Sequence, residues 1–150
     1  MIDPILLRRL LDEGLEVELR LRGSSMSPWL QSGDTVVLAP LAGRPIGLGD
    51  VVAIRRGAPR TEGGERWILV HRVVGRRDAL LLTRGDAGDR PDEPTAPEDV
   101  VARAVAWKRR GRRRRLGLGP ERHLIAWLSR RGVLAAARAL WRTQGPHRRP

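Results

Sequence analysis

A pair of serines and one histidine are the residues whose types could carry covalent chemistry in this chain. Ser24 and Ser25 lie in GSSMSP, between two stretches with strand patterns. A serine is a weak nucleophile at neutral pH, so it needs a base within hydrogen-bond reach and donors for the oxyanion that develops on the attacked carbonyl. Arginine does not give up its proton in proteins, and the only lysine, Lys108, lies in a crowded cationic run. If a conventional base activates a hydroxyl here, it is therefore His71.

Other chemistries find little support in the residue types. Taken alone, a serine pair at a turn and a histidine in a strand are ordinary structural features. A zinc site needs three or four Cys, His or carboxylate ligands, but the chain has no cysteine and its three histidines are far apart in sequence. No glycine-rich phosphate loop followed by lysine occurs. We expect no metal site and no cofactor.

Charge divides the chain of 150 residues into two parts. Residues 1–107 hold 15 basic and 16 acidic side chains, whereas residues 108–150 hold 14 basic side chains and one acid. The length is near that of one domain. This asymmetry predicts a folded domain over residues 1–107 and a basic tail over residues 108–150.

Hydrophobic periodicity predicts a mainly β domain that begins with one short amphipathic helix over residues 4–13. Strict alternation over 15–22 predicts a half-buried strand. β-branched and aliphatic runs that follow Gly-Asp or other turn signals predict the remaining strands. These strands are 35–40, 51–56, a hairpin of 65–75 and 78–83 around Gly75, and a closing strand over 100–107.

The basic tail begins with KRRGRRRR over residues 108–115, a composition typical of a solvated, disordered linker. Helical patterns with tryptophan follow over 124–128 and 133–142. Basic amphipathic helices of this kind are typical of membrane interfaces, so we expect residues 108–142 to contact an anionic membrane surface. A helical flap packed on the domain is the main alternative, and nucleic acid is a less favoured partner.

Neither a membrane span nor a secretory signal is expected. No apolar run is long enough to cross a bilayer, and charged residues from Asp3 onward interrupt the apolar region that a signal peptide needs. We expect a cytoplasmic protein with at most peripheral attachment to a membrane.

Five short boxes, in order over about residues 20–106, resemble those of the signal peptidase I family and its LexA-like relatives. GSSMSPWLQSGDTVVL resembles the nucleophile box and LGDVVAI the second box. HRVVG resembles the base box of archaeal and endoplasmic-reticulum signal peptidases, in which histidine replaces the lysine of common bacterial enzymes. LLTRGDAGDRPD resembles the following box, and DVVARAV resembles the closing strand.

The resemblance implies a signal-peptidase/LexA-like β-fold and assigns roles to particular residues. Ser25 would be the nucleophile, its backbone N–H an oxyanion donor, and His71 the general base. Asp92 has the spacing of the acid that completes the triad in histidine-type enzymes, while Asp86 of a Gly-Asp turn could orient that loop or the base. The substrate-binding candidates are Met26, in the cleft beside the nucleophile, and Pro28, which would fix the chain direction after it.

The function implied is that of a serine endopeptidase that cleaves a signal or leader peptide through an acyl-enzyme. Two alternatives remain open from the sequence. One is a LexA-like self-cleaving regulatory module. The other is a basic adaptor without enzymatic activity, which would bind membrane or nucleic acid and retain the β domain as a scaffold.

Overall fold

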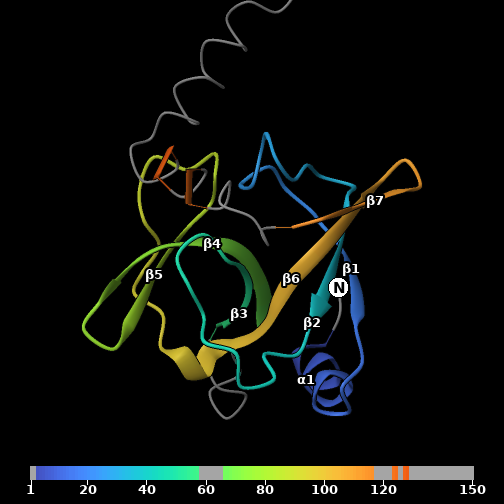
Figure 1. Ribbon diagram of the computed structural model, residues 1–150, viewed down its shortest axis with the longest axis horizontal. Helices are drawn as coiled ribbons and strands as arrows, with labels where there is room; N and C mark the ends of the chain where they lie inside the picture. Colours follow the sequence, from blue (N-terminus) through green and yellow to red (C-terminus); the bar gives the residue numbers. More distant parts are fainter. Residues whose placement is uncertain (1–2, 58–65, 117–122, 125–126, 129–150) are drawn as a thin grey trace, which may run out of the picture.

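Antiparallel strands dominate the part of the chain that the computed structural model describes, which is residues 3–57, 66–116, 123–124 and 127–128 (Figure 1). Seven strands form one sheet in the order β1-β2-β6-β3-β4-β5, and β7 pairs with β6. The elements are α1 (Pro4–Asp12), β1 (Val17–Arg20), β2 (Thr35–Ala39), β3 (Val51–Arg56), β4 (Trp67–Arg77), β5 (Leu80–Arg84), the short helix η2 (Pro97–Asp99), β6 (Val100–Arg109) and β7 (Arg112–Arg115). The prediction of a mainly β protein with a short N-terminal helix is confirmed.

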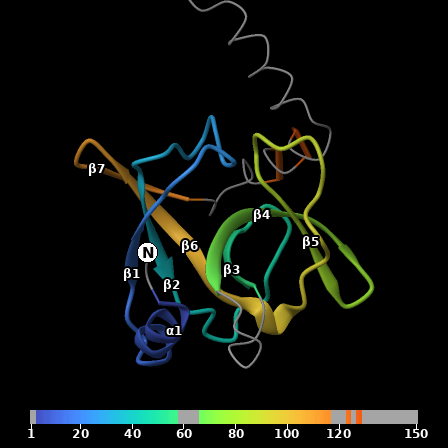
Figure 2. The same cartoon turned by 180° about the vertical axis from the view of Figure 1, so that it is seen from behind.

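The helix α1 begins and packs as its sequence predicts. The Asp3 carboxylate accepts a hydrogen bond from the Ile5 N–H at 2.8 Å, and Pro4 occupies the first turn, where no amide donor is needed. Leu7 and Leu11, four residues apart on one face, are buried. The helix therefore covers one end of the sheet near β1 and β2 (Figure 2).

The core lies on both faces of β3. Val51 and Ala53 belong to one cluster of buried side chains, while Val52 and Ile54 belong to a second. Because successive strand residues point to opposite faces, all four are buried only when both faces are covered. This explains why VVAIRR reads as a nearly continuous apolar run and not as an alternating strand.

The hairpin of β4 and β5 turns later than the sequence predicts. Gly75 lies inside β4, at a register shift between Val73 and Gly75. The turn falls instead at Asp78, which adopts φ +53°. Aspartate tolerates this left-handed conformation better than most residues do, which suits Asp78 to the turn. β4 therefore continues past Gly75 to Arg77 and contains a bulge before the chain reverses.

Three Gly-Asp turns, those of Asp34, Asp50 and Asp86, are each closed by an arginine from a strand of the sheet. Asp34 pairs with Arg109 at 2.6 Å, Asp50 with Arg103 at 3.1 Å, and Asp86 with Arg72 at 2.7 Å. Arginine presents a planar fork of donors that suits a carboxylate.

The basic run is a β-hairpin and not a linker, so the prediction for residues 108–115 is wrong. β6 continues to Arg109, and β7 returns along it. Arg113 pairs with Glu16 at 3.2 Å and Lys108 with Glu18, while Arg109 binds Asp34. Acids from other segments thus neutralise part of the run and permit it to fold.

The remainder of the expected basic tail is described only in part. Residues 123–124 and 127–128 are helical, at the position of the helix predicted over 124–128. The second expected helix, over 133–142, lies outside the described residues. None of the helical segments in the described ranges combines the length and apolar character that crossing a bilayer requires.

The Asp34–Arg109 pair anchors residues 21–34, which we call the serine loop, to the sheet. Asp34 is only 4% exposed; it accepts hydrogen bonds from Arg109 Nε and Nη2 at 2.8 and 2.6 Å and from the Gln31 N–H at 2.8 Å. Burial alone would raise the pKa of Asp34. The hydrogen bonds from Arg109 and Gln31, with the charge of Arg109, outweigh burial and hold that pKa below its usual value.

Replacing Arg109 tests this anchor. We expect Arg109→Gln to lower the free energy of unfolding at neutral pH by about 1–3 kcal/mol, because Asp34 is left buried without its charged partner. Since the Asp34 pKa is depressed by folding, the stabilisation is complete above the unfolded value of about 3.9 and is lost as pH falls through the folded pKa. Urea unfolding at a series of pH values should show the difference from wild type narrowing in acid.

Arg112→Gln is the matched control because Arg112 makes no ion pair within the described part of the chain. An equal loss in Arg112→Gln, or a loss in Arg109→Gln that does not change with pH, would contradict the role given to this pair.

Candidate active site

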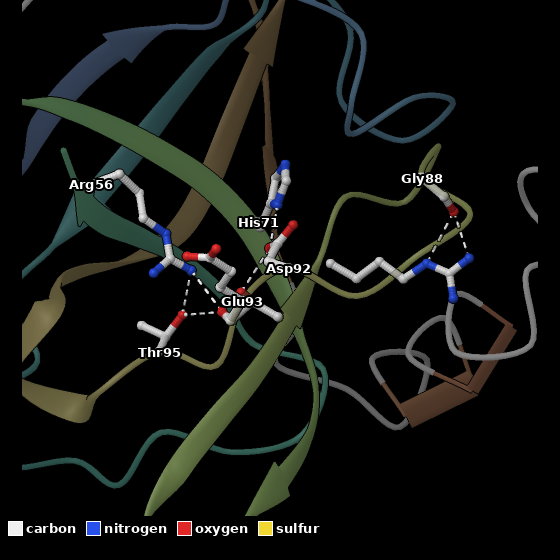
Figure 3. Close-up of polar contacts among 8 residues, drawn as sticks. Arg56, His71, Gly88, Asp92, Glu93 and Thr95 are labelled. Atoms are coloured by element: carbon white, nitrogen blue, oxygen red, sulfur yellow. Dashed lines mark hydrogen bonds and ion pairs between the residues drawn. The ribbon is translucent and has the colours of Figure 1, made fainter.

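His71 and Asp92 form a short hydrogen bond at the surface of the sheet (Figure 3). His71 Nδ1 lies 2.6 Å from Asp92 Oδ2, with the histidine in the middle of β4 and the aspartate in the segment after β5. A carboxylate only accepts hydrogen bonds, so this contact selects the tautomer of His71 that carries its proton on Nδ1. In the neutral ring, Nε2 is then the acceptor and can take a proton from another group.

Thr83 fixes the position of Asp92. Its hydroxyl donates to Asp92 Oδ2 at 2.8 Å, and its carbonyl accepts from the Asp92 N–H at 2.9 Å. Thr83 lies on β5 and is fully buried. Asp92 is thus held by both its backbone and its side chain, which orients the oxygen that binds His71.

Two further arginine contacts frame the segment that carries Asp92 (Figure 3). Arg84 Nε and Nη2 donate to the Gly88 carbonyl at 3.0 and 2.5 Å. Arg56 Nη2 donates to the Thr95 hydroxyl at 2.7 Å and to the Glu93 carbonyl at 3.0 Å. Contacts on both sides of Asp92 therefore restrict its segment.

Ser25 meets His71 across Gly85. A Cβ placed on Gly85 would lie 3.0 Å from His71 Nε2, 3.0 Å from Ser25 Cβ and 2.6 Å from the Ser25 carbonyl oxygen. Nε2 and Ser25 Cβ are therefore no further apart than twice 3.0 Å. The Ala87 N–H donates to the Ser25 carbonyl at 2.7 Å, which ties the serine loop to the turn after β5. The serine pair is thus unequal, since it is Ser25 that makes these contacts with the His71 region.

The proton acceptor of the histidine is unused within the described residues. Nε2 is buried and has no hydrogen-bond partner there, so the Ser25 hydroxyl is not bonded to it in this structure. Ser25 itself is exposed. Catalytic hydrogen bonds are often long or absent before substrate binds and form in the complex. A buried acceptor without a partner costs free energy in a folded protein. His71 Nε2 is therefore a candidate for binding a further group.

Asp86 lies away from the histidine and is held by Arg72. Arg72 Nε and Nη2 donate to the two Asp86 oxygens at 2.8 and 2.7 Å, and Nη1 donates to the Gly49 carbonyl at 3.0 Å. Both side chains are buried. Of the two acids considered from the sequence, Asp92 contacts the histidine, while Asp86 anchors the turn that carries Gly85.

A groove of about 610 Å³ adjoins Ser25. Its walls are residues 19–23, which continue β1, and residues 67–70 of β4, and Met26 and Leu30 lie between them. Met26 is thus placed beside Ser25 as a lining residue. Pro28 is not among the lining residues; it is exposed and follows a cis peptide bond from Ser27.

The sequence reasoning missed Thr83, Gly85 and Arg72. Thr83 and Gly85 are part of LLTRGD, which resembles a box of the family, and Arg72 directly follows His71. A charged residue in the middle of a buried strand pattern was the available signal for Arg72, since such a residue needs a partner. No comparable signal marks Gly85, because its role depends on a contact between distant segments.

Comparisons with known proteins add no family assignment. Neither a scan against protein-family models nor a search of curated proteins finds a match for this chain. Among the residues that the structure describes, no three His, Asp or Glu side chains gather as they would around a metal ion.

Gly85→Ala tests the close contact between the serine loop and β4. Its methyl group would meet the backbone oxygen of Ser25 at 2.6 Å, so the loop must shift, and we expect a loss of about 1–3 kcal/mol in the free energy of unfolding. Gly47→Ala is the control, because its Cβ would have only an ordinary contact at 3.8 Å with Asp50. Chemical denaturation measures the free energy of unfolding of both variants. Equal values for Gly85→Ala and Gly47→Ala would contradict the close contact between the serine loop and β4.

Proposed function

We propose that this protein is a serine endopeptidase of signal-peptidase type that cleaves a signal or leader segment. The observation that carries the proposal is the meeting of Ser25 with the buried, unpaired Nε2 of His71, whose Nδ1 is held by Asp92. A serine close to a histidine that is held by an acid is the arrangement that would activate a hydroxyl for acyl transfer.

In the first step the Ser25 hydroxyl attacks the scissile carbonyl. The hydroxyl proton passes to His71 Nε2, and Asp92 stabilises the imidazolium through Nδ1. The backbone N–H of Ser25 would donate to the developing oxyanion; it makes no hydrogen bond among the described residues, and Gly23, with φ +82°, supplies the turn before it. Rotation of the Ser25 side chain toward Nε2 accompanies substrate binding.

In the second step the imidazolium gives its proton to the leaving amine, and the C–N bond breaks. The acyl group remains on the Ser25 oxygen as an ester. Water then attacks the ester carbonyl while Nε2 takes the proton of that water, and the ester bond breaks with the proton returned to Ser25. The mechanism needs no cofactor.

Two open strand edges support an extended peptide as substrate. β1 pairs only with β2, and β5 pairs with β4 only from Arg72 onward, so residues 67–71 have β3 as their one strand partner within the described chain. These edges lie on opposite walls of the groove. Unpaired backbone donors and acceptors of this kind recognise a peptide by adding it as a strand.

Side chains of the groove favour an apolar segment. Leu19, Leu21 and Ile68 are only partly buried and pack against the cluster that contains Met26. Trp67 is 45% exposed and lies with Ile68 on the β4 wall of the groove. Apolar side chains of a leader peptide would cover this surface and gain free energy from leaving water.

Cleavage assays with leader-bearing peptides test the proposal. We expect Ser25→Ala and His71→Ala to lower kcat/KM by at least about 10³-fold, because each removes a group that takes part in bond making or proton transfer. Mass spectrometry of the products measures new termini. Ser24→Ala is the matched control and should retain cleavage within a few-fold of wild type. Equal activity in wild type, Ser25→Ala and His71→Ala would exclude the mechanism.

Replacing Asp92 should affect mainly cleavage activity, whereas replacing Asp86 should affect mainly the free energy of unfolding. We expect Asp92→Asn to lower kcat by about 10²–10⁴-fold with little change in stability, because the orientation and charge support of His71 are lost. We expect Asp86→Asn to lower the free energy of unfolding by about 3–5 kcal/mol, because Arg72 is left buried and unpaired. Steady-state kinetics and urea unfolding of both variants measure the two effects. The reverse pattern would show that Asp86 supports the histidine.

A further inference from the structure

The β6–β7 hairpin has two faces that differ in charge. Side chains alternate along paired strands, and the register places Arg109 opposite Arg112 and Trp107 opposite Arg114 on one face. Lys108 and Arg113 lie opposite each other on the second face, where Glu18 and Glu16 neutralise them. We call the first of these the tryptophan face.

The tryptophan face keeps two uncompensated charges. Arg109 is paired with Asp34, but Arg112 and Arg114 make no ion pair within the described residues. Arg114 and Arg109 lie over the Trp107 ring, at 6.0 and 4.6 Å from its centre. Both unpaired arginines are exposed. This face therefore combines cationic groups with an aromatic ring beneath them.

A second tryptophan lies next to this face. Arg109 Nη2 donates to the carbonyl of Trp29 at 3.2 Å, and Trp29 is 43% exposed. Trp29 belongs to the serine loop, and in both views the hairpin projects from the sheet beside that loop (Figures 1 and 2). An exposed indole and exposed arginines thus occur together, with no acid among the described residues neutralising Arg112 or Arg114.

We propose that Arg112 and Arg114 of the tryptophan face, with Trp29, attach this protein to an anionic phospholipid bilayer. Arginines near such a surface gain attraction from its negative potential, and tryptophan is favoured at the boundary between headgroups and acyl chains. The projecting hairpin reaches a flat surface without distortion of the sheet. The inference does not depend on the proposed peptidase activity.

The charge distribution favours a lipid surface over nucleic acid. Strong nucleic-acid binding requires a basic stripe that follows many phosphates, whereas here the unneutralised charges of the tryptophan face are two arginines beside an exposed indole. On the opposite face of the hairpin Glu18 and Glu16 neutralise Lys108 and Arg113, which leaves Arg115 as the one arginine of β7 on that face without an ion pair among the described residues. A compact cationic and aromatic patch matches an interface between anionic headgroups and apolar chains.

Vesicle sedimentation with the full chain tests the proposal. Wild type should bind vesicles of phosphatidylcholine mixed with phosphatidylserine, and binding should fall with salt. The double variant Arg112→Gln/Arg114→Gln should bind about 25-fold more weakly, since each arginine contributes about fivefold. Trp29→Ala should also weaken binding and reduce the blue shift of tryptophan emission on vesicles. Circular dichroism and thermal unfolding check that each variant remains folded.

The control variant is Arg44→Gln/Arg77→Gln, which removes the same charge from exposed positions outside the hairpin. It should bind within about twofold of wild type. Equal binding by both double variants would assign attachment to residues outside the hairpin and would overturn the proposal. Tighter binding of wild type to duplex DNA than to the anionic vesicles, lost in Arg112→Gln/Arg114→Gln, would overturn it in favour of nucleic acid.

Discussion

The missing side chain at Gly85 is the constraint on which the candidate site depends. The serine loop, the middle of β4 and the turn after β5 converge there, and a single methyl group would collide with Ser25 and His71. The hydrogen bond from the Ala87 N–H to the Ser25 carbonyl requires the same close approach of the two segments. The approach of Ser25 to His71 that the proposed chemistry requires thus depends on glycine's lack of volume and not on its conformational freedom.

Two neighbouring side chains of β4, His71 and Arg72, have different partners and different structural roles. His71 and Arg72 point to opposite faces of the strand, and each binds an acid from the segment that follows β5: Asp92 and Asp86, respectively. The arginine pair is buried and bidentate, so it fixes the start of that segment. The histidine pair lies near the exposed Ser25, so the same strand carries a structural anchor and the base of the proposed mechanism. Thr83, on the next strand, holds Asp92 in position through a hydrogen bond from its hydroxyl.

Local patterns carried much of the fold, because helix 4–12 and strand 51–56 depend on periodicity and caps within a few residues. The β6–β7 hairpin was not predictable in this way, since the charges of Lys108, Arg109 and Arg113 are offset by Glu18, Asp34 and Glu16, which are distant in sequence. Choosing between Asp86 and Asp92 likewise required knowing which face of β4 each acid meets. Residue types alone pointed to His71 because the chain offers so few bases, and the family resemblance then favoured Ser25 over Ser24. Gly85 and Thr83 act through contacts that only the folded chain creates.

Arg109 has a mechanical consequence. It belongs to the β6–β7 hairpin, yet it holds Asp34 and the Trp29 carbonyl of the loop that carries Ser25. The hairpin cannot tilt relative to that loop without breaking charge-assisted hydrogen bonds to a buried carboxylate. A force applied to the tip of the β6–β7 hairpin is therefore transmitted to the serine loop, and the hairpin and the loop move together as one unit.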